Sequence, residues 1–535
     1  MAKRILGILA VVLIATTPLL AQSTTSGAVS GQVTDSSGAA LPGVTVELSG
    51  SAMQGTRTTV TDSQGQYRFL NVPPGEGYRA VATLAGFAPL TKNIQRVYLG
   101  QEATINFTLR AAVAEAITVT AEAPLVDVTR TTTGVNVTSR QFESLPTQRT
   151  FQQLTTLAPS VSMEMADSRP QTPNSPNVGA SSAPENNYII DGLSTTDARY
   201  GISGTNLTMN FVEEVQVMTG GYSAEFGRST GGVFNVITKS GGNEFHGDVF
   251  GYYSDSSWSD ARARIIEKGS ATSNLGTTTH FANLTDSADV GLSLGGPIMR
   301  DRLWFFAAFN PSRKTTNIGG FRDDASGNVN SDATDYDTET DHYAAKLTFA
   351  ATPNHNFVIT AFGDPTTQEG WLGASNSSSA SALRTRDIGS NNAAVRYTGI
   401  FGPSFLAEAT VGRHSKDSTL APITDVGRNV PRQIDETAGQ ITYGGFPRFQ
   451  EDEATRNSYA IKFSNFLASH ELRYGYDVEQ NEYQADLHET WFRYFGDRTL
   501  SGANYDYIQE RSYAVQGAGE TKNSALFLQD QWKLR

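Results

Sequence analysis

One serine of the chain stands in a pattern typical of hydrolases. The segment Gly291-Leu-Ser293-Leu-Gly295 matches G-x-S-x-G, in which a serine nucleophile sits on a strained turn between a strand and a helix. Here the serine lies inside an alternating run that predicts a strand, and no helix pattern follows it. We interpret the match as accidental, because the motif has meaning only in its structural context. The chain also lacks cysteine and any H-E-x-x-H pattern, so we expect no catalytic residues, no zinc centre, no cofactor and no enzyme.

A run of carboxylates offers a different chemistry. Carboxylate oxygens are the ligands that calcium prefers, about six to eight of them per ion. The spacing lacks the order of an EF-hand, so we favour a solvated acidic loop without a metal, with calcium binding as the alternative. The residues are Asp332, Asp335, Asp337, Glu339 and Asp341.

Several large aromatic side chains fall in segments that we expect to be long loops. Exposed loops on a rigid scaffold often bind ligands, whereas aromatic residues near a bilayer also serve as interface anchors. Both interpretations stay open for Trp258, Trp371, Trp491 and Tyr505.

The first 21 residues have the three-part form of a secretory signal. Lys3 and Arg4 precede the apolar run Ile5 to Ala15, and small Ala21 stands at the expected cut. Removing them leaves 39 basic and 54 acidic residues, a formal charge of −15, because the signal carries two of the 41 basic residues. An acidic chain without a basic run is a poor nucleic-acid binder. No other segment approaches about eighteen apolar residues, so any insertion into a membrane must use β-strands.

Residues 22–110 predict a small antiparallel β-sandwich. Strand-like pieces at 28–33, 44–48, 58–61, 67–70, 78–84 and 104–109 are separated by turns such as Asp35-Ser-Ser-Gly38 and Asp62-Ser-Gln-Gly65. The pattern GQVTDSSGAALPGVTVEL, followed by TDSQGQYRFLNVPPGEGYRAVAT, resembles the carboxypeptidase regulatory-like domain, a transthyretin-like sandwich. That resemblance implies no catalytic site of its own.

A linker of small residues, 111–123, surrounds one extended segment. Strand addition by a partner needs an accessible β-prone backbone, which this segment supplies. The segment resembles the TonB box of outer-membrane receptors, which the periplasmic protein TonB grips as an added strand. Its residues are Glu115, Ala116, Ile117, Thr118, Val119, Thr120 and Ala121.

The character of the sequence changes across Val212 to Tyr253, where short strands joined by glycine turns give way to long alternating strands. Residues 124–240 resemble the α/β plug of TonB-dependent receptors, with a short helix expected within 141–157 and a flexible loop at 165–187. The matching segments point to the Oar-like branch. The plug-motif residues are Asp191, Gly192, Glu225, Phe226, Gly227, Arg228, Gly231, Gly232 and Asn235.

Residues 241–535 predict part of a large antiparallel barrel. Ten strand candidates lie at 244–253, 288–298, 303–309, 342–350, 356–362, 393–401, 405–413, 458–466, 471–479 and 524–534. Short turns at 299–302, 353–355, 402–403 and 467–470 alternate with connections of roughly twenty-five residues or more. This alternation is typical of an up-and-down barrel in outer-membrane lipid, and it assigns the N-terminal sandwich to the periplasm. A barrel that holds a plug needs about 22 strands, so we expect a C-terminally truncated sequence.

The resemblance implies a mainly β TonB-dependent outer-membrane receptor. It would capture a large or scarce substrate, whether siderophore, glycan, peptide or protein, and use the inner-membrane proton motive force through TonB to move it. The alternative is a surface adhesin or structural outer-membrane protein that uses the same scaffold without active transport.

Overall fold

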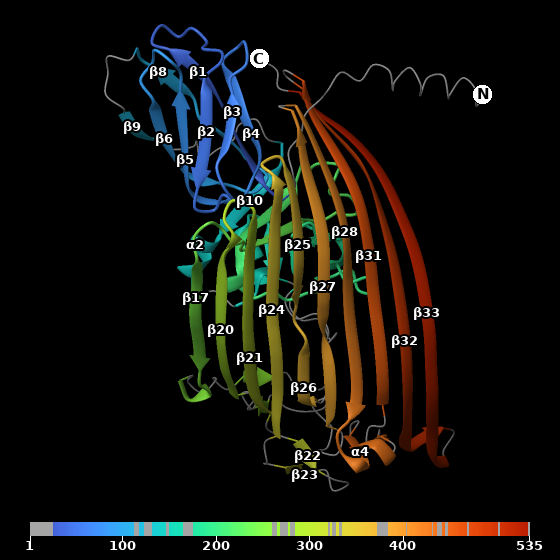
Figure 1. Cartoon of the computed structure of the whole chain (residues 1–535). Helices are drawn as coiled ribbons and strands as arrows, with labels where there is room; N and C mark the ends of the chain where they lie inside the picture. Colours follow the sequence, from blue (N-terminus) through green and yellow to red (C-terminus); the bar gives the residue numbers. More distant parts are fainter. Residues whose placement is uncertain are drawn as a thin grey trace, which may run out of the picture.

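The computed structural model gives the protein three parts (Figure 1). An N-terminal sandwich lies at one end of a long curved sheet, and a smaller sheet, the plug, lies against the inner face of that long sheet. The structure describes residues 25–111, 117–121, 131–145, 149–163, 175–258, 265–267, 276–278, 284–318, 321–323, 328–330, 334–371, 383–402, 404–430, 432–435, 441–444, 448–467, 470–500 and 503–532. The expected signal lies outside them.

The sandwich packs two sheets around an aliphatic and aromatic core. One sheet has the order β3 (Arg57–Val60), β2 (Thr45–Gly50), β5 (Gly75–Thr83), β6 (Leu90–Val97), β9 (Ile117–Ala121). The other has the order β4 (Gln66–Val72), β1 (Gly27–Asp35), β7 (Glu102–Thr104), and β8 (Phe107–Leu109) also pairs with β1. Its fully buried residues include Val29, Val46, Leu48, Tyr78 and Phe107.

Two expectations for the sandwich were wrong. Strand β6 was not predicted, because only its second half places apolar side chains inside. The sandwich is also not wholly antiparallel, because β7 and β8 pair with β1 in parallel, as β9 does with β6.

The plug is built on a five-stranded sheet. Its order is β10 (Thr133–Thr138), β15 (Val212–Gly220), β16 (Val233–Thr238), β13 (Asn187–Ile190), β14 (Leu193–Ser194). All six residues of β16 are buried, as expected for a central strand covered on both faces. The helices are α2 (Ser139–Glu143), α3 (Phe151–Leu154), η1 (Thr155–Leu157), η2 (Ala183–Glu185) and η3 (Met209–Phe211). Within the expected loop 165–187, Pro176–Val178 instead forms β12, which pairs with β11 (Val161–Met163).

The long sheet is an antiparallel meander, and each of the ten strand predictions falls in one of its strands. They are β17 (His246–Ser254), β20 (Leu284–Met299), β21 (Leu303–Ile318), β24 (Thr334–Thr352), β25 (His355–Gly363), β27 (Arg384–Phe401), β28 (Phe405–Pro422), β31 (Arg448–Leu467), β32 (His470–Leu500) and β33 (Ala503–Trp532). The short strands β26 (Thr366–Trp371), β29 (Arg432–Asp435) and β30 (Ile441–Gly444) also pair into it.

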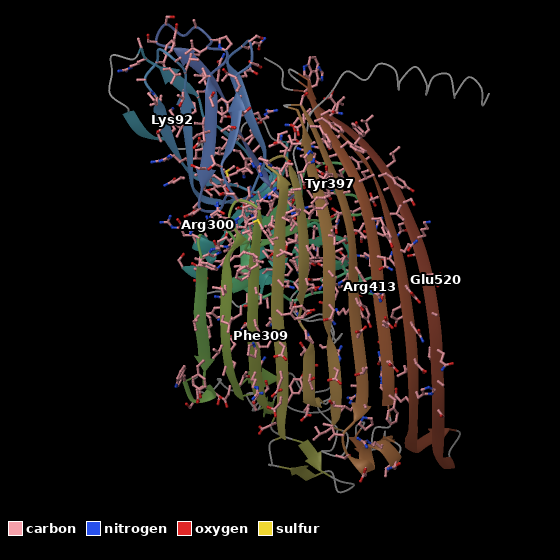
Figure 2. All side chains as sticks on the ribbon, in the orientation of Figure 1. Lys92, Arg300, Phe309, Tyr397, Arg413 and Glu520 are labelled. Atoms are coloured by element: carbon pink, nitrogen blue, oxygen red, sulfur yellow. The ribbon has the colours of Figure 1, made fainter. Side chains whose placement is uncertain are left out.

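Alternation divides the two faces of this sheet. Ala344, Lys346 and Thr348 of β24 are buried on the inner face, against the plug, whereas Phe349 is 42% exposed on the outer face. The outer face carries a lateral row of exposed apolar side chains on adjacent strands. Their cross-strand pairs are Ile359 with Val395, Val395 with Val411, and Val411 with Tyr459. Phe309, on β21, is labelled in Figure 2 and is likewise exposed.

The two ends of the long sheet differ. The strands on either side of each of the four predicted short turns pair with each other, and we call this end the turn end. The opposite end, near β22 (Phe321–Asp323), β23 (Asn328–Asn330) and α4 (Asp425–Asn429), is the loop end (Figure 1). Arg300, in one short turn, lies at the end that faces the sandwich (Figure 2). A Cβ added to Gly55 of the sandwich would lie 3.4 Å from Asp301 of that turn. The sandwich therefore meets the turn end.

Several expected loops proved to be strand extensions. Residues 480–523 were expected to form a long loop, but β32 and β33 continue through most of them and place Trp491 and Tyr505 in strands. The acidic residues from Asp335 to Asp341 lie in β24 rather than in a loop. Trp258 ends the short helix η4 (Ser256–Trp258), and Trp371 ends β26. Among the described residues, no helix is both long and apolar enough to span a bilayer.

Candidate functional site

The Asp-Gly turn predicted at the end of a buried plug strand connects β13 to β14. Asp191 and Gly192 have φ values of 49° and 83°, which suit a tight hairpin turn of this composition. The turn brings the Asp191 carboxylate to the end of β16, where it accepts hydrogen bonds from Thr238 Oγ1 at 2.5 Å and from the Thr238 backbone N–H at 3.1 Å.

A lysine from the long sheet completes this cluster. Lys346 Nζ, on the inner face of β24, donates to Asp191 Oδ1 at 2.9 Å and to the Thr238 carbonyl at 2.8 Å. Arg396 of β27 donates to the Asp191 carbonyl at 3.2 Å. Both partners of the ion pair are buried, so the pair lies in a medium where neither charge is tolerated alone. We call Asp191, Thr238 and Lys346 the latch.

The second half of the plug motif makes further ion pairs with the long sheet. Glu225 is held by Arg473 at 2.6 Å and by Lys462 at 3.4 Å. Burial raises the pKa of Glu225, but the two cations outweigh it and leave the pKa below its ordinary value. Arg228, whose φ is 66°, binds Asp477 at 3.1 Å and also Glu479.

The remaining motif residues shape the plug itself. Phe226 packs with Met218 and Val233, and the Gly227 carbonyl accepts from Asn187 Nδ2 at 3.3 Å. A Cβ on Gly231 or Gly232 would come within 2.5 Å of a neighbouring side chain, so both positions need glycine. Asn235 is fully buried and donates to Gln216.

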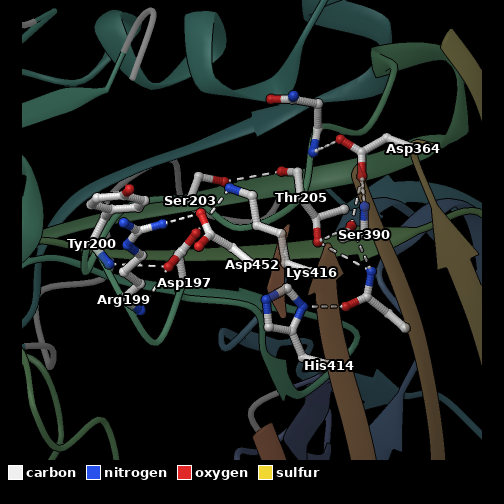
Figure 3. A network of polar contacts seen from close by, with 12 residues as sticks. Asp197, Arg199, Tyr200, Ser203, Thr205, Asp364, Ser390, His414, Lys416 and Asp452 are labelled. Atoms are coloured by element: carbon white, nitrogen blue, oxygen red, sulfur yellow. Dashed lines mark hydrogen bonds and ion pairs between the residues drawn. The ribbon is translucent and has the colours of Figure 1, made fainter. Parts of the chain in front are cut away.

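A polar cavity of about 160 Å³ lies between the plug and the inner face of the long sheet. It is built around the plug segment from Thr195 to Asn206, which a Thr196–Ser203 bridge folds back on itself. Asp197 of this segment binds Lys416 of β28 at 3.0 Å, and Arg199 binds Asp452 of β31 (Figure 3). Lys416 lies beyond the middle of its strand, and Asp452 lies near the loop end. The cavity is therefore on the side of the plug away from the sandwich.

The cavity combines charge with aromatic surface. The Arg199 guanidinium lies over the Tyr200 ring at 4.6 Å and over the Tyr483 ring at 5.0 Å. Burial raises the pKa of Asp197, but Lys416 and three hydrogen bonds outweigh it, so this pKa lies below its ordinary value. Fixed acidic, basic and aromatic groups suit a ligand that presents both hydrogen-bond donors and acceptors.

One wall of the cavity is a hydrogen-bonded network that ties the plug to β27 (Figure 3). Asp364 accepts from the Asn206 backbone at 2.9 Å and from Ser390 Oγ at 2.6 Å. Ser390 also bonds Thr205, and Asn392 bonds His414 Nδ1 at 2.6 Å. The histidine does not contact the serine, so these residues position the plug and do not form a nucleophilic triad.

Strand β9 contains the described part of the predicted TonB box. Its residues Ile117, Thr118, Val119, Thr120 and Ala121 pair in parallel with Leu90 to Ile94 of β6. Glu115 and Ala116 lie outside the described residues.

The sandwich is joined to the plug at the C-terminal end of β6. Arg96 Nη2 binds Glu213 at 2.9 Å and Glu214 at 3.5 Å, and the Leu99 N–H donates to Glu214 Oε1 at 2.9 Å. Asn136 donates to the same Glu214 oxygen at 2.5 Å and to the Leu99 carbonyl at 3.0 Å. We call Arg96, Leu99, Asn136, Glu213 and Glu214 the clamp.

The clamp holds two carboxylates against one guanidinium. Burial raises the pKa of Glu213 to about 7 although Arg96 opposes it, and burial likewise raises the pKa of Glu214. Burial disfavours the charge of Arg96, but Glu214, Glu213 and Glu76 outweigh this and raise its pKa. Burial in the docked clamp therefore favours the protonated form of Glu213.

Sequence reasoning singled out the plug-motif residues as a prediction and did not identify the partners that the structure gives them. The missed residues are Arg96, Asp197, Arg199, Glu213, Glu214, Lys346, Asp364, Lys416 and Asp452. The one available signal was Lys346: a lysine at an inward position of an alternating strand needs an acidic partner.

Comparison with known proteins agrees with this architecture. The model of the carboxypeptidase regulatory-like domain matches residues 28–110, that of the TonB-dependent receptor plug domain residues 125–233, and that of an outer membrane β-barrel domain residues 237–321. The chain is 33% identical over 410 residues to the TonB-dependent transporter Oar of Myxococcus xanthus, which covers 68% of this chain and 37% of Oar. The chain thus spans little more than a third of that relative.

One solved structure supports the fold. The outer membrane transporter YddB from Escherichia coli matches with a TM-score of 0.54 and 17% identity, over 76% of this chain and 56% of that one. The ferric yersiniabactin uptake receptor FyuA from Yersinia pestis matches with a TM-score of 0.45 and 11% identity, over 75% of this chain and 62% of that one.

Breaking the latch should loosen the plug. Lys346→Met leaves the Asp191 carboxylate buried without its cation, which costs about 3–5 kcal/mol. We expect the hydrogen-exchange protection of the Thr238 amide, which donates to Asp191, to fall at least about a hundredfold. The double variant Lys346→Met with Asp191→Asn removes both charges and should recover part of the loss. Equal protection in wild type and K346M would contradict the latch.

The clamp should weaken as pH rises. Because the pKa of Glu213 is raised to about 7, its contribution to docking is complete below the ordinary value near 4.5 and is lost as pH rises through about 7. We expect the exchange protection of the Leu99 amide, corrected for intrinsic rates, to fall about tenfold between pH 5 and 7.5. Glu213→Gln mimics the protonated acid, so it should flatten this dependence and raise protection at pH 7.5. A steeper loss in E213Q would refute the assignment.

Proposed function

The chain is a homologue of the TonB-dependent transporter Oar, with the carboxypeptidase regulatory-like, plug and barrel domains of that group, and from this premise we propose that it moves a substrate across the outer membrane with energy delivered through TonB. The barrel domain and the homologue imply an outer-membrane location. An adhesin or purely structural role on the same scaffold is not favoured, because the homologue is a transporter.

The observation that carries the proposal is the position of β9. An extended segment immediately before the plug is an edge strand at the turn end of the molecule, where a partner could add a strand of its own. Short turns of outer-membrane barrels face the periplasm. We therefore assign the sandwich and β9 to the periplasmic side and the loop end to the outside.

The cavity is the proposed point of capture. It lies on the side of the plug away from the sandwich, which is the side that a substrate from outside would reach, and plug and sheet both contribute charged groups to it. A substrate that competes for Lys416 or Asp452 would loosen the contacts of the segment from Thr195 to Asn206. Substrate binding outside would thereby alter the plug, on which TonB acts from the other side.

The chemistry of the cavity narrows the substrate without identifying it. Paired acids and bases beside two tyrosines favour a polar molecule with both donors and acceptors over an apolar one. Siderophores, glycans, peptides and proteins all offer such groups.

The TonB box can be tested by a proline substitution. Val119→Pro removes a backbone N–H from the middle of β9 and fixes its φ, so it should block strand addition, whereas Val119→Ala keeps the backbone intact. We expect V119P in the full-length protein to weaken binding of the purified periplasmic domain of TonB at least about tenfold, while V119A changes it little. Both variants should insert into the outer membrane like wild type. Unchanged binding of the TonB domain by V119P would contradict the assignment of β9 as the TonB box.

A further inference from the structure

The TonB box is held as part of the sandwich sheet. β9 extends the order β3-β2-β5-β6 by one strand, in a parallel register that runs from Leu90 opposite Ile117 to Ile94 opposite Ala121. The pairing uses one edge of β9, and no strand in the described part of the chain pairs with the other. Because N–H and C=O groups of a strand alternate between its two edges, one edge stays available for a further strand.

The opposite edge of the same sheet is less suited to a partner. It is formed by β3, which has only four residues. Arg57 of β3 donates to the carbonyls of Leu70 and Asn71 at 2.8 and 3.0 Å, which ties this edge to the second sheet. The open edge of β9 is therefore the edge at which a partner strand can be added to this sheet.

The strand that holds β9 leads directly into the clamp. β6 ends at Val97, so Arg96 and Leu99, which hold Glu213 and Glu214, lie at its C-terminal end. Arg96 is 7% exposed and Glu214 is fully buried, so this is a packed joint rather than a surface contact.

The clamp in turn lies beside the latch. Its two glutamates stand at the start of β15, where Val212 pairs with Thr238 and Glu214 with Ile237 of β16. Thr238 bonds both Asp191 and Lys346. Contiguous contacts thus run from β9 through β6, the clamp and β15 to the ion pair that fixes the plug to the long sheet.

We propose that TonB adds its strand to the open edge of β9 while β9 stays paired with β6, so that the sandwich forms part of the TonB docking surface and passes the load through the clamp to β15. The inference rests on the proposed function, because it takes β9 to be the TonB box. A lengthwise pull on β9 acts across all the hydrogen bonds of the β6–β9 pair together, so the pair resists it as a unit. The load reaches the plug beside the latch, in addition to passing along the backbone between β9 and β10.

A reversible disulfide between β6 and β9 tests whether β9 must separate from β6 before TonB binds. Thr91 and Thr118 are cross-strand partners in the backbone register, and the chain has no cysteine, so Thr91→Cys with Thr118→Cys allows one defined disulfide. In the full-length protein we expect the oxidised and reduced forms to bind the purified periplasmic domain of TonB with affinities within about threefold. Binding by the reduced form that drops more than about tenfold on oxidation would overturn the inference and leave the proposed function standing. Failure of wild type to bind this domain would refute the proposed function itself.

A second measurement tests the route through the clamp. We expect TonB-domain binding to change hydrogen exchange in both β6 and β15 of wild type. Arg96→Gln should bind the domain equally and keep the change in β6 but lose that in β15, and Arg96→Lys should retain part of it. Arg68→Gln is the matched control, because its ion pair with Glu102 lies within the sandwich. A β15 response that persists in R96Q, or that disappears equally in R68Q, would show that the load does not pass through Arg96.

Discussion

The structure depends on how the polar and charged side chains on the inner face of the long sheet find partners. Alternation gives that sheet an apolar outer face, and the same alternation fills the inner face with polar and charged side chains that need partners. The plug supplies them: Asp191 meets Lys346, Glu225 meets Arg473 and Lys462, and Asp197 meets Lys416. The plug is thus held to the long sheet by ion pairs and also by apolar contacts, because Phe306 and Phe362 of the long sheet belong to the same buried core as Phe211 of the plug.

The stability of an ion-paired contact depends on both charges staying together. A buried ion pair contributes little net stability compared with an apolar contact, yet removing one partner is costly, because the other charge is then stranded. The ion-paired part of the interface can therefore be replaced if water or a competing group reaches both partners together. An apolar interface of the same size would have no such alternative partners, since neither water nor a polar ligand replaces a hydrophobic contact.

The sequence was sufficient to predict a strand or a turn wherever the pattern within that one segment determines it. Ten alternating runs gave ten strands of the long sheet, and the Asp191-Gly192 pair gave its turn. Strand ends were less predictable: β32 and β33 continue through polar, alternating residues that resemble a loop in composition, because pairing with each other satisfies their backbones. β6 was missed because none of the residues in its first half, Leu90 to Asn93, is fully buried. Partners such as Lys346 and Asp191 are 155 residues apart, and only the fold brings them together.

The same reasoning indicates that the sandwich is coupled to the plug and is not merely tethered to it. A domain tethered only by a linker would not need a fully buried glutamate at its border, because burying that carboxylate is unfavourable unless several donors satisfy it. Glu214 has those donors in Arg96, Leu99 and Asn136, which come from both the sandwich and the plug. The two domains therefore share one polar joint, placed between the strand that holds β9 and the strand next to the latch. Because burial raises the pKa of Glu213 to about 7, a change of pH near neutrality changes the charge of this joint.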